Sequence, residues 1–477
     1  MRQRNTTNPW VILVLICLAQ FMVVLDATIV NVALPSIQKD LGLSEANLQW
    51  IVNAYTLVFG GFLLLGGRAG DLLGRKRLFL IGLVIFTTAS LLNGLSSSSG
   101  QLIGFRGLQG LGAALISPAA LSIISTTFAE GKERARALGV WAAIAIGGSA
   151  FGLVLGGWLT QSFSWPWIFF VNVPVGVFAF LATFRLVPES KDEHAHQGYD
   201  IAGAVTVTGG LMTLVYAIVK AETAGWGSTT TIGLFLAALA LLTSFVVIEM
   251  RSKEPLVRLS IFKTRSLTTA NLTMFLVGSG MFAMFFFITL YLQRVLVYHP
   301  LKAGLSVLPF TAGIMVSAGL ASTLAPRLGV RPVAAVGMVL TAIGMLLFAR
   351  MPVGGSYVTD VLPGMIVASL GMGAVFMPIT LVATTGLKDE DQGLASGLFN
   401  TSQQIGGALG LAILATIAAG RTHGSSKAAL VHGFHYAFAG ASVFVVAALV
   451  LMLALLRKRD VARIEAEATG GAAVVGA

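Results

Sequence analysis

An aspartate stands deep inside the first long apolar segment of the chain. Asp26 lies between Phe21 and Pro35, with apolar residues on both sides. A charge at bilayer depth costs at least about 2.5–3.5 kcal/mol, so such a residue is retained for a reason. Desolvation disfavours the charged form of a carboxyl group, which can then bind and release a proton. Asp26 is therefore predicted to carry the proton of a proton-coupled carrier; the alternative is a structural carboxylate with a permanent partner.

Arg106 is the basic residue that falls within an apolar segment, and Gln109 follows it. The first segment is expected to run outward and the fourth inward. At 1.5 Å per residue, Asp26 then lies roughly 10 Å and Arg106 roughly 8 Å below the outer ends of their helices. We expect the two charges to couple directly or through Asn31, Gln109 or water. Arg106 would hold Asp26 ionised in one state and release it in another; a fixed ion pair is the alternative.

A glycine-rich turn with charged residues is expected after the second helix. Glycines permit a sharp reversal of the chain and a close approach of helices. Because an aspartate adds little to a topology signal, the turn is predicted to form a latch that opens during a transport cycle, rather than to supply topogenic charge alone. The latch residues are Gly67, Asp71, Gly74, Arg75 and Lys76, with Arg77 beside them.

Glycines recur in the fifth apolar segment at a spacing of four residues. Such a row lets two helix backbones approach closely. The row is predicted to serve either general packing or a specific interface that moves between states. It consists of Gly148, Gly152 and Gly156, followed by Gly157.

Polar amides within apolar segments usually face the interior of a helix bundle. Asn400, Gln403 and Gln404 precede a group of glycines near the C-terminus, and they are predicted either to line a substrate cavity or to join helices. Asn31 and Gln109 are the corresponding candidates for substrate contact in the first and fourth segments.

The composition requires a membrane around these residues. Of the 477 residues, 56% are hydrophobic and 11% are charged, whereas soluble domains contain about 25% charged residues. A membrane-spanning helix needs about 20 apolar residues, and segments of this size recur to the end of the chain. The spans are predicted at 10–33, 48–68, 78–96, 101–127, 137–160, 167–187, 201–220, 231–249, 268–292, 303–324, 331–350, 361–384, 394–419 and 434–456.

The distribution of Lys and Arg sets the predicted topology. Most of these residues fall in loops on the side of both termini, which places the termini in the cytoplasm. We predict an all-α polytopic membrane protein with about 14 transmembrane helices arranged as 6 + 2 + 6. Its expected parts are an N-terminal six-helix bundle at 1–190, two extra helices with their loops at 191–265, a C-terminal six-helix bundle at 266–457 and a cytoplasmic tail at 458–477.

The sequence lacks the residue patterns of nucleic-acid binding, metal binding and nucleotide hydrolysis. The net charge of +11 is explained by loops on one membrane face rather than by nucleic-acid binding. The six histidines show no spacing typical of a metal site, and Cys17 is the single cysteine. The sequence contains no GxxxxGK[ST] phosphate-binding loop. No cofactor is therefore expected, and the energy must come from an ion gradient, a partner or the substrate's own gradient.

Together these motifs resemble the major facilitator superfamily, and within it the fourteen-helix drug:proton antiporter family, over nearly the whole chain. The matching segments are Leu25 to Pro35 for the first-helix signature, Gly67 to Arg77 for the loop 2–3 motif, Arg106 to Ala114 for the fourth-helix arginine motif and Gly148 to Gly157 for the antiporter motif of helix five. Trp165 to Gly176, Gly225 to Gly227 and Asn400 to Gly410 also have counterparts. Leu153 stands where the antiporter motif usually has proline, which leaves a kink there in question.

The resemblance implies a proton-coupled antiporter, not an enzyme, in the bacterial cytoplasmic membrane. It would export lipophilic small molecules such as drugs, antibiotics or a natural product by alternating access. The protein is expected to function as a monomer. The resemblance links Arg106 to proton transfer. The alternative is a proton-coupled importer of a metabolite on the same fold. A further alternative is a protein that is not a transporter, such as an intramembrane enzyme or a receptor. An enzyme would need a nucleophile with a base or a set of metal ligands within the spans, and the sequence shows none. A channel would conduct without a saturable proton-coupled cycle.

Overall fold

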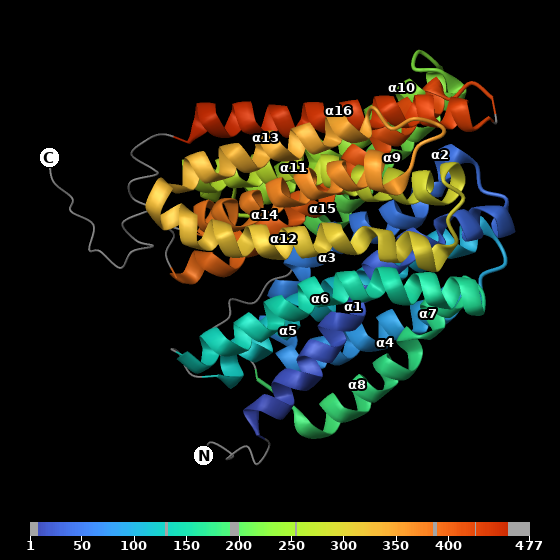
Figure 1. The fold of residues 1–477 in the computed structure, drawn as a ribbon. Helices are drawn as coiled ribbons and strands as arrows, with labels where there is room; N and C mark the ends of the chain where they lie inside the picture. The colour runs from blue at the N-terminus through green and yellow to red at the C-terminus, as the bar shows by residue number, and fades with distance from the viewer. Residues whose placement is uncertain are drawn as a thin grey trace, which may run out of the picture. The chain divides into compact units, whose positions relative to one another are not determined.

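The computed structural model describes residues 8–128, 132–190, 200–252, 255–384, 389–424 and 426–456. Within these ranges the chain is helical and contains no strand (Figure 1). Thirteen of the described helices are long and apolar enough to cross a membrane. Another helix of 31 residues, α6, occupies the remaining predicted span at 137–160. Every predicted span therefore coincides with a helix, because a backbone in lipid must satisfy its hydrogen bonds internally.

The chain divides into two compact units. The first comprises Met1–Ala217, Ile232–Leu256 and His299–Leu305. The second comprises Ile218–Thr231, Val257–Tyr298 and Ser306–Ala477. The predicted tail at 458–477 and most of the loop after 190 lie outside the described residues.

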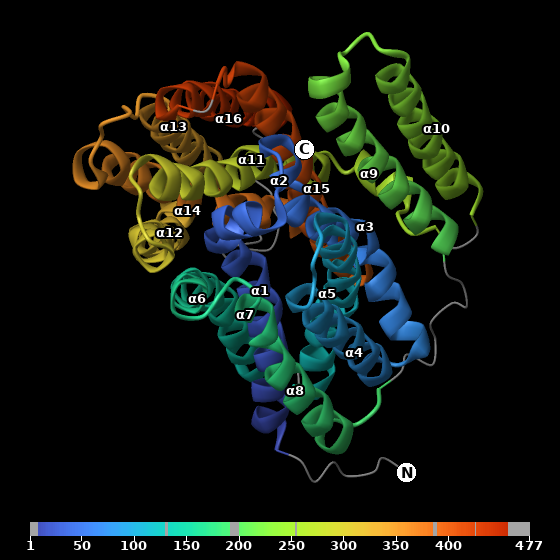
Figure 2. The ribbon, with the colours of Figure 1, turned by 90° about the vertical axis from the view of Figure 1, so that its right-hand side faces the viewer.

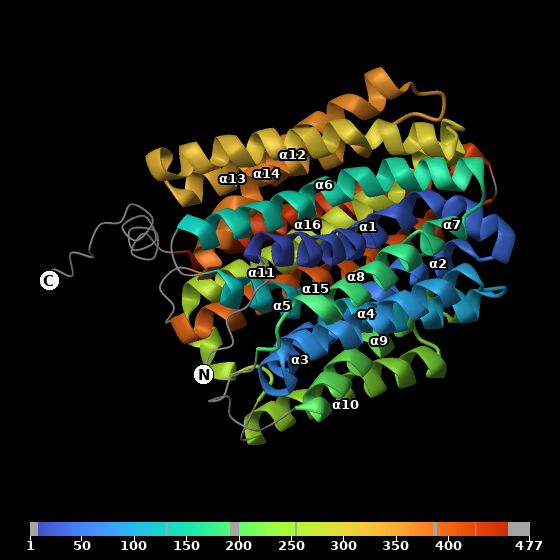
Figure 3. The same cartoon turned by 90° about the horizontal axis from the view of Figure 1, so that it is seen from below.

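The first ten α-helices belong to the first unit, apart from the end of α9 and the start of α10, which belong to the second. They are α1 (Pro9–Leu41), α2 (Glu45–Leu48), α3 (Trp50–Leu73), α4 (Arg75–Gly94), α5 (Ser99–Thr127), α6 (Lys132–Ser162), α7 (Trp167–Phe170), α8 (Asn172–Leu186), α9 (Ile201–Ala224) and α10 (Thr229–Arg251). Helix α5 packs against both α3 and α4, and α4 packs against α8 (Figure 2). Helix α6 packs along α1 (Figure 3). These contacts bring α1, α3, α4, α5 and α8 together around one interior.

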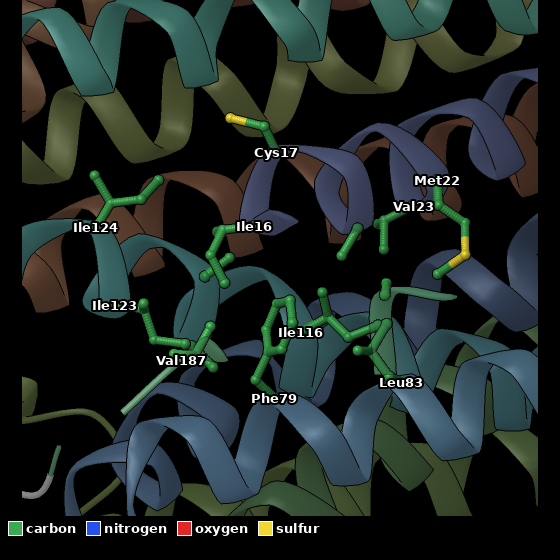
Figure 4. Close-up of a cluster of buried hydrophobic side chains, with 14 of the residues drawn as sticks. Ile16, Cys17, Met22, Val23, Phe79, Leu83, Ile116, Ile123, Ile124 and Val187 are labelled. Atoms are coloured by element: carbon green, nitrogen blue, oxygen red, sulfur yellow. The ribbon is translucent and has the colours of Figure 1, made fainter. Parts of the chain in front are cut away.

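Apolar side chains fill the part of this interior that lies between α1, α4 and α5. Figure 4 shows Ile16 and Met22 of α1, Phe79 of α4 and Ile116 of α5 in this cluster. These four side chains are at most 1% exposed. A polar group placed in such a core has no access to water and must find its partners within the protein.

Helix α1 is longer than its predicted span, which ended at 33. The side chain of Asn8 accepts a hydrogen bond from the N–H of Trp10 and caps the start of the helix. The helix continues through Pro35 and ends at Gly42, whose φ of 64° lies in the left-handed region that glycine tolerates. Asp26 therefore stands near the middle of one continuous helix.

The second unit contains the helices that follow. They are η1 (Leu259–Lys263), α11 (Arg265–Leu290), η2 (Tyr291–Val295), α12 (Pro300–Leu328), α13 (Val330–Phe348), η3 (Tyr357–Val361), α14 (Leu362–Thr384), α15 (Asp389–Arg421) and α16 (Lys427–Leu455), of which the start of α12 belongs to the first unit. Helix α11 packs against α15 and α16, and α13 packs against α14.

Candidate proton-coupling site

Asp26 of α1 and Arg106 of α5 meet in the interior of the first unit. Arg106 Nη1 donates a hydrogen bond to Asp26 Oδ2 over 2.5 Å. The exposed fractions of the two side chains are 1% for Arg106 and 0% for Asp26. The two charges that the sequence placed at similar depth are thus in direct contact. In this nonpolar surrounding each charge depends on the other, because removing one partner leaves an uncompensated buried charge.

Two neutral amides hold the other oxygen of the carboxylate. Gln109 Nε2 donates to Asp26 Oδ1 over 2.8 Å, and Asn172 Nδ2 of α8 donates to the same atom over 3.0 Å. The carboxylate therefore accepts three hydrogen bonds, one from a charged donor and two from amides. The sequence predicted Gln109 as a link between the charges, and it donates to Asp26 while accepting from Arg106.

Helix α3 provides a second set of contacts for the guanidinium group. Arg106 Nε donates to the backbone carbonyl of Ile51 in α3 over 3.0 Å. Within its own helix α5, Arg106 Nη1 also donates to Gln109 Oε1 over 2.8 Å. The guanidinium carbon lies 4.3 Å from the centre of the Tyr55 ring, which is a cation–π distance. Arg106 can therefore keep several contacts when its bond to Asp26 is lost.

Helix α4 completes the polar cluster with Ser90 and Asn93. Ser90 Oγ accepts from Gln109 Nε2 at 3.2 Å and from Asn172 Nδ2 at 3.1 Å, and it donates to the carbonyl of Phe169 at 2.9 Å. Asn93 Nδ2 donates to Gln109 Oε1 at 2.7 Å. Because Gln109 Oε1 faces two donors, the orientation of its amide follows from the hydrogen bonds.

Glycines of α5 allow the neighbouring helices to come this close. A Cβ atom on Gly110 would lie 3.1 Å from the Cα of Tyr55 in α3, and one on Gly112 would lie 2.6 Å from the backbone nitrogen of Phe86 in α4. Any larger side chain would push α3 or α4 away from Arg106. The glycines that follow Arg106 in the sequence therefore help to build the site.

The glycine row of α6 packs against α1 on either side of Asp26. A Cβ atom would lie 3.2 Å from the Phe21 ring at Gly148, 3.0 Å from the carbonyl oxygen of Leu25 at Gly152, and 2.7 Å from that of Ile29 at Gly156. Gly157 instead approaches Leu301 in the segment His299–Leu305 of the same unit. Helix α6 is continuous through Leu153. The row is thus an interface with the helix that carries the aspartate.

Other predicted site residues lie apart from this cluster. Asn31 donates to the carbonyls of Ala27 and Thr28 in its own helix, since five residues turn it about 140° around α1 from Asp26. In the second unit, Asn400 is exposed and donates to the Ser396 carbonyl of its own helix. Gln403 and Gln404 are half-buried in the same helix. A role of these amides in substrate binding stays a prediction.

Helix α15 approaches α11 closely just beyond these amides. Cβ atoms on Gly406 and Gly410 would collide with the backbone of Phe275 and with Ser279, respectively. Ser279 Oγ donates to the carbonyl of Gly406 over 2.9 Å. The glycines after the amides therefore serve helix packing within the second unit.

The predicted latch turn contacts the segment that follows α8. Gly74 has a φ of 106° and precedes α4, and a Cβ atom there would lie 2.6 Å from a carboxylate oxygen of Glu189. That carboxylate accepts from the backbone N–H groups of Lys76 and Arg77, each over 3.1 Å. Lys76 Nζ donates to the Phe184 carbonyl over 2.8 Å. An anion thus caps the start of α4 and a cation the end of α8, as the helix dipoles favour.

The remaining latch residues take smaller parts in these contacts. The backbone N–H of Arg75 donates to the Ser190 carbonyl over 3.0 Å. Gly67 faces Pro118 of α5, where a Cβ atom would find ordinary contact at 3.7 Å. The side chain of Asp71 lies outside the described residues. Its predicted role in a latch therefore stays a prediction.

Sequence reasoning did not single out Asn172, Ser90, Asn93, Tyr55 or Glu189. Ser90 and Asn93 stand three residues apart in an apolar segment, which is a signal of one polar helix face. Asn172 was noted only within the segment from Trp165 to Gly176. Glu189 gave no signal, because its partners are backbone N–H groups that sequence patterns do not show.

Comparison with known proteins adds independent information. A sequence model of the Major Facilitator Superfamily matches residues 16–411. The chain is 40% identical to the puromycin resistance protein pur8 of Streptomyces alboniger, over 98% of this chain and 94% of that protein. It is 39% identical to the cephamycin export protein CmcT of Amycolatopsis lactamdurans, over 94% of this chain and 93% of that protein. It is 34% identical to the tetracenomycin C resistance and export protein of Streptomyces glaucescens, over 87% of this chain and 77% of that protein.

Solved structures show the same fold at low sequence identity. A bacterial homologue of the human lysosomal transporter Spinster, in an inward-facing and occupied conformation, has a TM-score of 0.66 at 16% identity. That match covers 94% of this chain and 98% of the other. A bacterial homologue of the human drug peptide transporters PepT1 and PepT2 has a TM-score of 0.65 at 16% identity. That match covers 96% of this chain and 100% of the other.

The contact between α6 and α1 predicts the effect of a single methyl group. Gly152→Ala should displace α1 near Leu25 and Thr28, destabilise the protein by about 1–3 kcal/mol as overpacking does, and reduce transport. The measurements are the thermal unfolding midpoint in detergent and the transport rate in vesicles. Gly147→Ala is the control on the same helix, because no described atom lies within 4 Å of its Cβ position. Equal behaviour of the two variants would contradict this packing role.

The cap on α4 predicts a graded response at Glu189. Glu189→Ala should lower stability by roughly 1 kcal/mol, because two N–H groups at the helix start lose their acceptor. The stability of Glu189→Gln should lie between those of the wild type and Glu189→Ala, since glutamine keeps an acceptor oxygen but loses the charge. Thermal unfolding of the purified protein measures both variants against the wild type. An unfolding midpoint that Glu189→Ala leaves unchanged would exclude the cap as a stabilising contact.

Proposed function

Since this chain belongs to the major facilitator superfamily, we propose that it is a proton-coupled antiporter that exports lipophilic small molecules across the cytoplasmic membrane. The observation that carries the proposal is the buried contact between Asp26 and Arg106, enclosed by helices of one unit. Three relatives that align with most of this chain have names that refer to resistance against or export of puromycin, a cephamycin and tetracenomycin C. Their names support an antibiotic or a related natural product as the substrate.

The proposed coupling is a competition between a proton and a guanidinium group for one carboxylate. A charged Asp26 is stabilised by Arg106 and by two amide donors. A proton on Asp26 removes the attraction to Arg106, whose contacts to Ile51, Gln109 and Tyr55 remain available. Each protonation state of Asp26 therefore favours a different set of contacts between α1 and α5. A difference of this kind is what a proton gradient needs to drive a two-state transport cycle.

The direction and setting of transport follow from the same proposal. The excess of Lys and Arg in the loops on the side of the termini supports a cytoplasmic location for both termini. Export then requires that protons enter the cell as substrate leaves, with no cofactor and with the proton gradient as the energy source. The chain is proposed to act as a monomer. An importer of a metabolite on the same fold would carry substrate and proton in the same direction.

Neutralising Asp26 should abolish proton-driven export. Everted membrane vesicles that contain the wild type should accumulate puromycin or tetracenomycin C when their lumen is acidified. Asp26→Asn should reduce this accumulation to the level of vesicles without the protein, because no proton binds at the site. Exchange of labelled for unlabelled substrate without a gradient should persist, which shows that the variant is folded.

Asp40→Asn is the matched control for this experiment. Asp40 ends the same helix, is exposed, and accepts a hydrogen bond from Trp165 Nε1 over 2.7 Å, which asparagine can also accept. Vesicles with Asp40→Asn should accumulate as much substrate as vesicles with the wild type. Undiminished accumulation with Asp26→Asn would refute the coupling mechanism, and accumulation driven in the opposite direction by the gradient would indicate import.

Replacing Arg106 tests the other half of the ion pair. Arg106→Ala should abolish gradient-driven accumulation, because a buried carboxylate is left without its counter-charge. Arg106→Lys should retain part of it, since lysine keeps the charge but cannot reproduce the forked contacts to Asp26, Gln109 and Ile51. The same vesicle assay measures both variants. Intact coupling in Arg106→Ala would show that Asp26 works without this partner.

A further inference from the structure

The two oxygens of Asp26 have different surroundings. Oδ2 accepts from the charged Arg106 Nη1. Oδ1 accepts from two neutral amides, Gln109 Nε2 and Asn172 Nδ2. An approaching proton competes directly with Arg106 for Oδ2. The amide donors at Oδ1 can stay in place in either protonation state, because the carbonyl oxygen of a protonated carboxyl group still accepts hydrogen bonds.

Asn172 is fixed by contacts at both ends of a short segment. Its Nδ2 also donates to Ser90 Oγ over 3.1 Å, so both amide hydrogens have acceptors. Ser90 Oγ in turn donates to the carbonyl of Phe169, three residues before Asn172, over 2.9 Å. Only Val171 separates α7 from α8 at this point, and Ser90 joins both helices to α4. Asn172 is 1% exposed, so its amide has no solvent alternative.

We propose that Asn172 is a positioning residue that holds Oδ1 of Asp26 in both protonation states and thereby makes Oδ2 the oxygen that exchanges the proton. This inference rests on the proposed proton coupling and specifies how the carboxyl group is held during it. Gln109 shares the task at Oδ1, but it is also bound to Arg106 and moves with α5. Asn172 comes from α8 and is independent of the arginine.

Among the side chains that the structure describes, few groups around Asp26 can change charge. Helix α5 presents Arg106 and helix α3 presents the phenol of Tyr55. The other contacting helices present neutral groups: Ser90 from α4, Gly152 from α6 and Asn172 from α8. A change in the pH dependence of transport in an Asn172 variant can therefore be assigned to the Asp26 cluster.

The test is the pH profile of gradient-driven puromycin accumulation in everted vesicles. Asn172→Leu keeps the branched shape and the number of side-chain heavy atoms but lacks the amide donor. It should move the profile toward higher pH by about one unit, a tenfold change in proton affinity, because a carboxylate with fewer donors binds a proton more readily. Thr183→Val is the matched control on α8. Thr183 is 0% exposed, and its hydroxyl has no hydrogen-bond partner among the described residues, so the profile should not move.

A second measurement uses the wild-type protein and needs no substrate. Infrared difference spectra between acid and alkaline pH should contain a carboxyl C=O band that is absent from Asp26→Asn. If Oδ1 keeps both amide donors, this band should have the low frequency of a doubly hydrogen-bonded carbonyl. A band at the frequency of a free carbonyl would overturn the proposal even if Asn172→Leu cannot be purified.

The outcomes separate this inference from the proposed function. A shifted profile in Asn172→Leu with an unchanged Thr183→Val supports the positioning role, and an unchanged profile in both overturns it. If the wild type shows no pH-dependent accumulation, the proposed function fails. In that case the infrared band of Asp26 still decides how its carboxyl group is held.

Discussion

The ion pair between Asp26 and Arg106 constrains the whole first unit. Each charge loses its hydration when it is buried, and the loss is offset only if every donor and acceptor of the pair finds a partner. The partners come from α1, α3, α4, α5 and α8, so these five helices must meet at one point. In lipid, where apolar surface gains little from helix contact, such polar contacts and close packing hold helices together.

Close packing of helices around the Asp26–Arg106 ion pair depends on glycines. Gly110 and Gly112 let α3 and α4 approach α5, and Gly152 lets α6 approach α1 beside the aspartate. Helix α1, which carries Asp26, is therefore packed on one side against a glycine row and held on the other by hydrogen bonds. This arrangement joins two of the sequence motifs, the fourth-helix arginine and the helix-five glycines, into one structural unit around α1.

Charged groups also satisfy the backbone at the start of α4 and at the end of α8. Glu189 offers its carboxylate to the free N–H groups at the start of α4, and Lys76 reaches the carbonyl groups at the end of α8. Both contacts lie in one unit and join the glycine turn to the segment after α8. They also show why the basic residues of this turn do more than set topology, since Lys76 has a defined acceptor.

The sequence alone determined the helices and the two central charges. Hydropathy located every span because a long apolar segment in lipid satisfies its backbone hydrogen bonds within itself by forming a helix. The rise per residue placed Asp26 and Arg106 at one depth. It could not show which way each side chain faces, because helices that are apolar on all sides carry no facing signal. Only the tertiary structure decided that Asn172 and Ser90 join the pair and that Glu189 caps α4. These contacts depend on helix rotation and on backbone groups, and both are set by packing between segments distant in sequence.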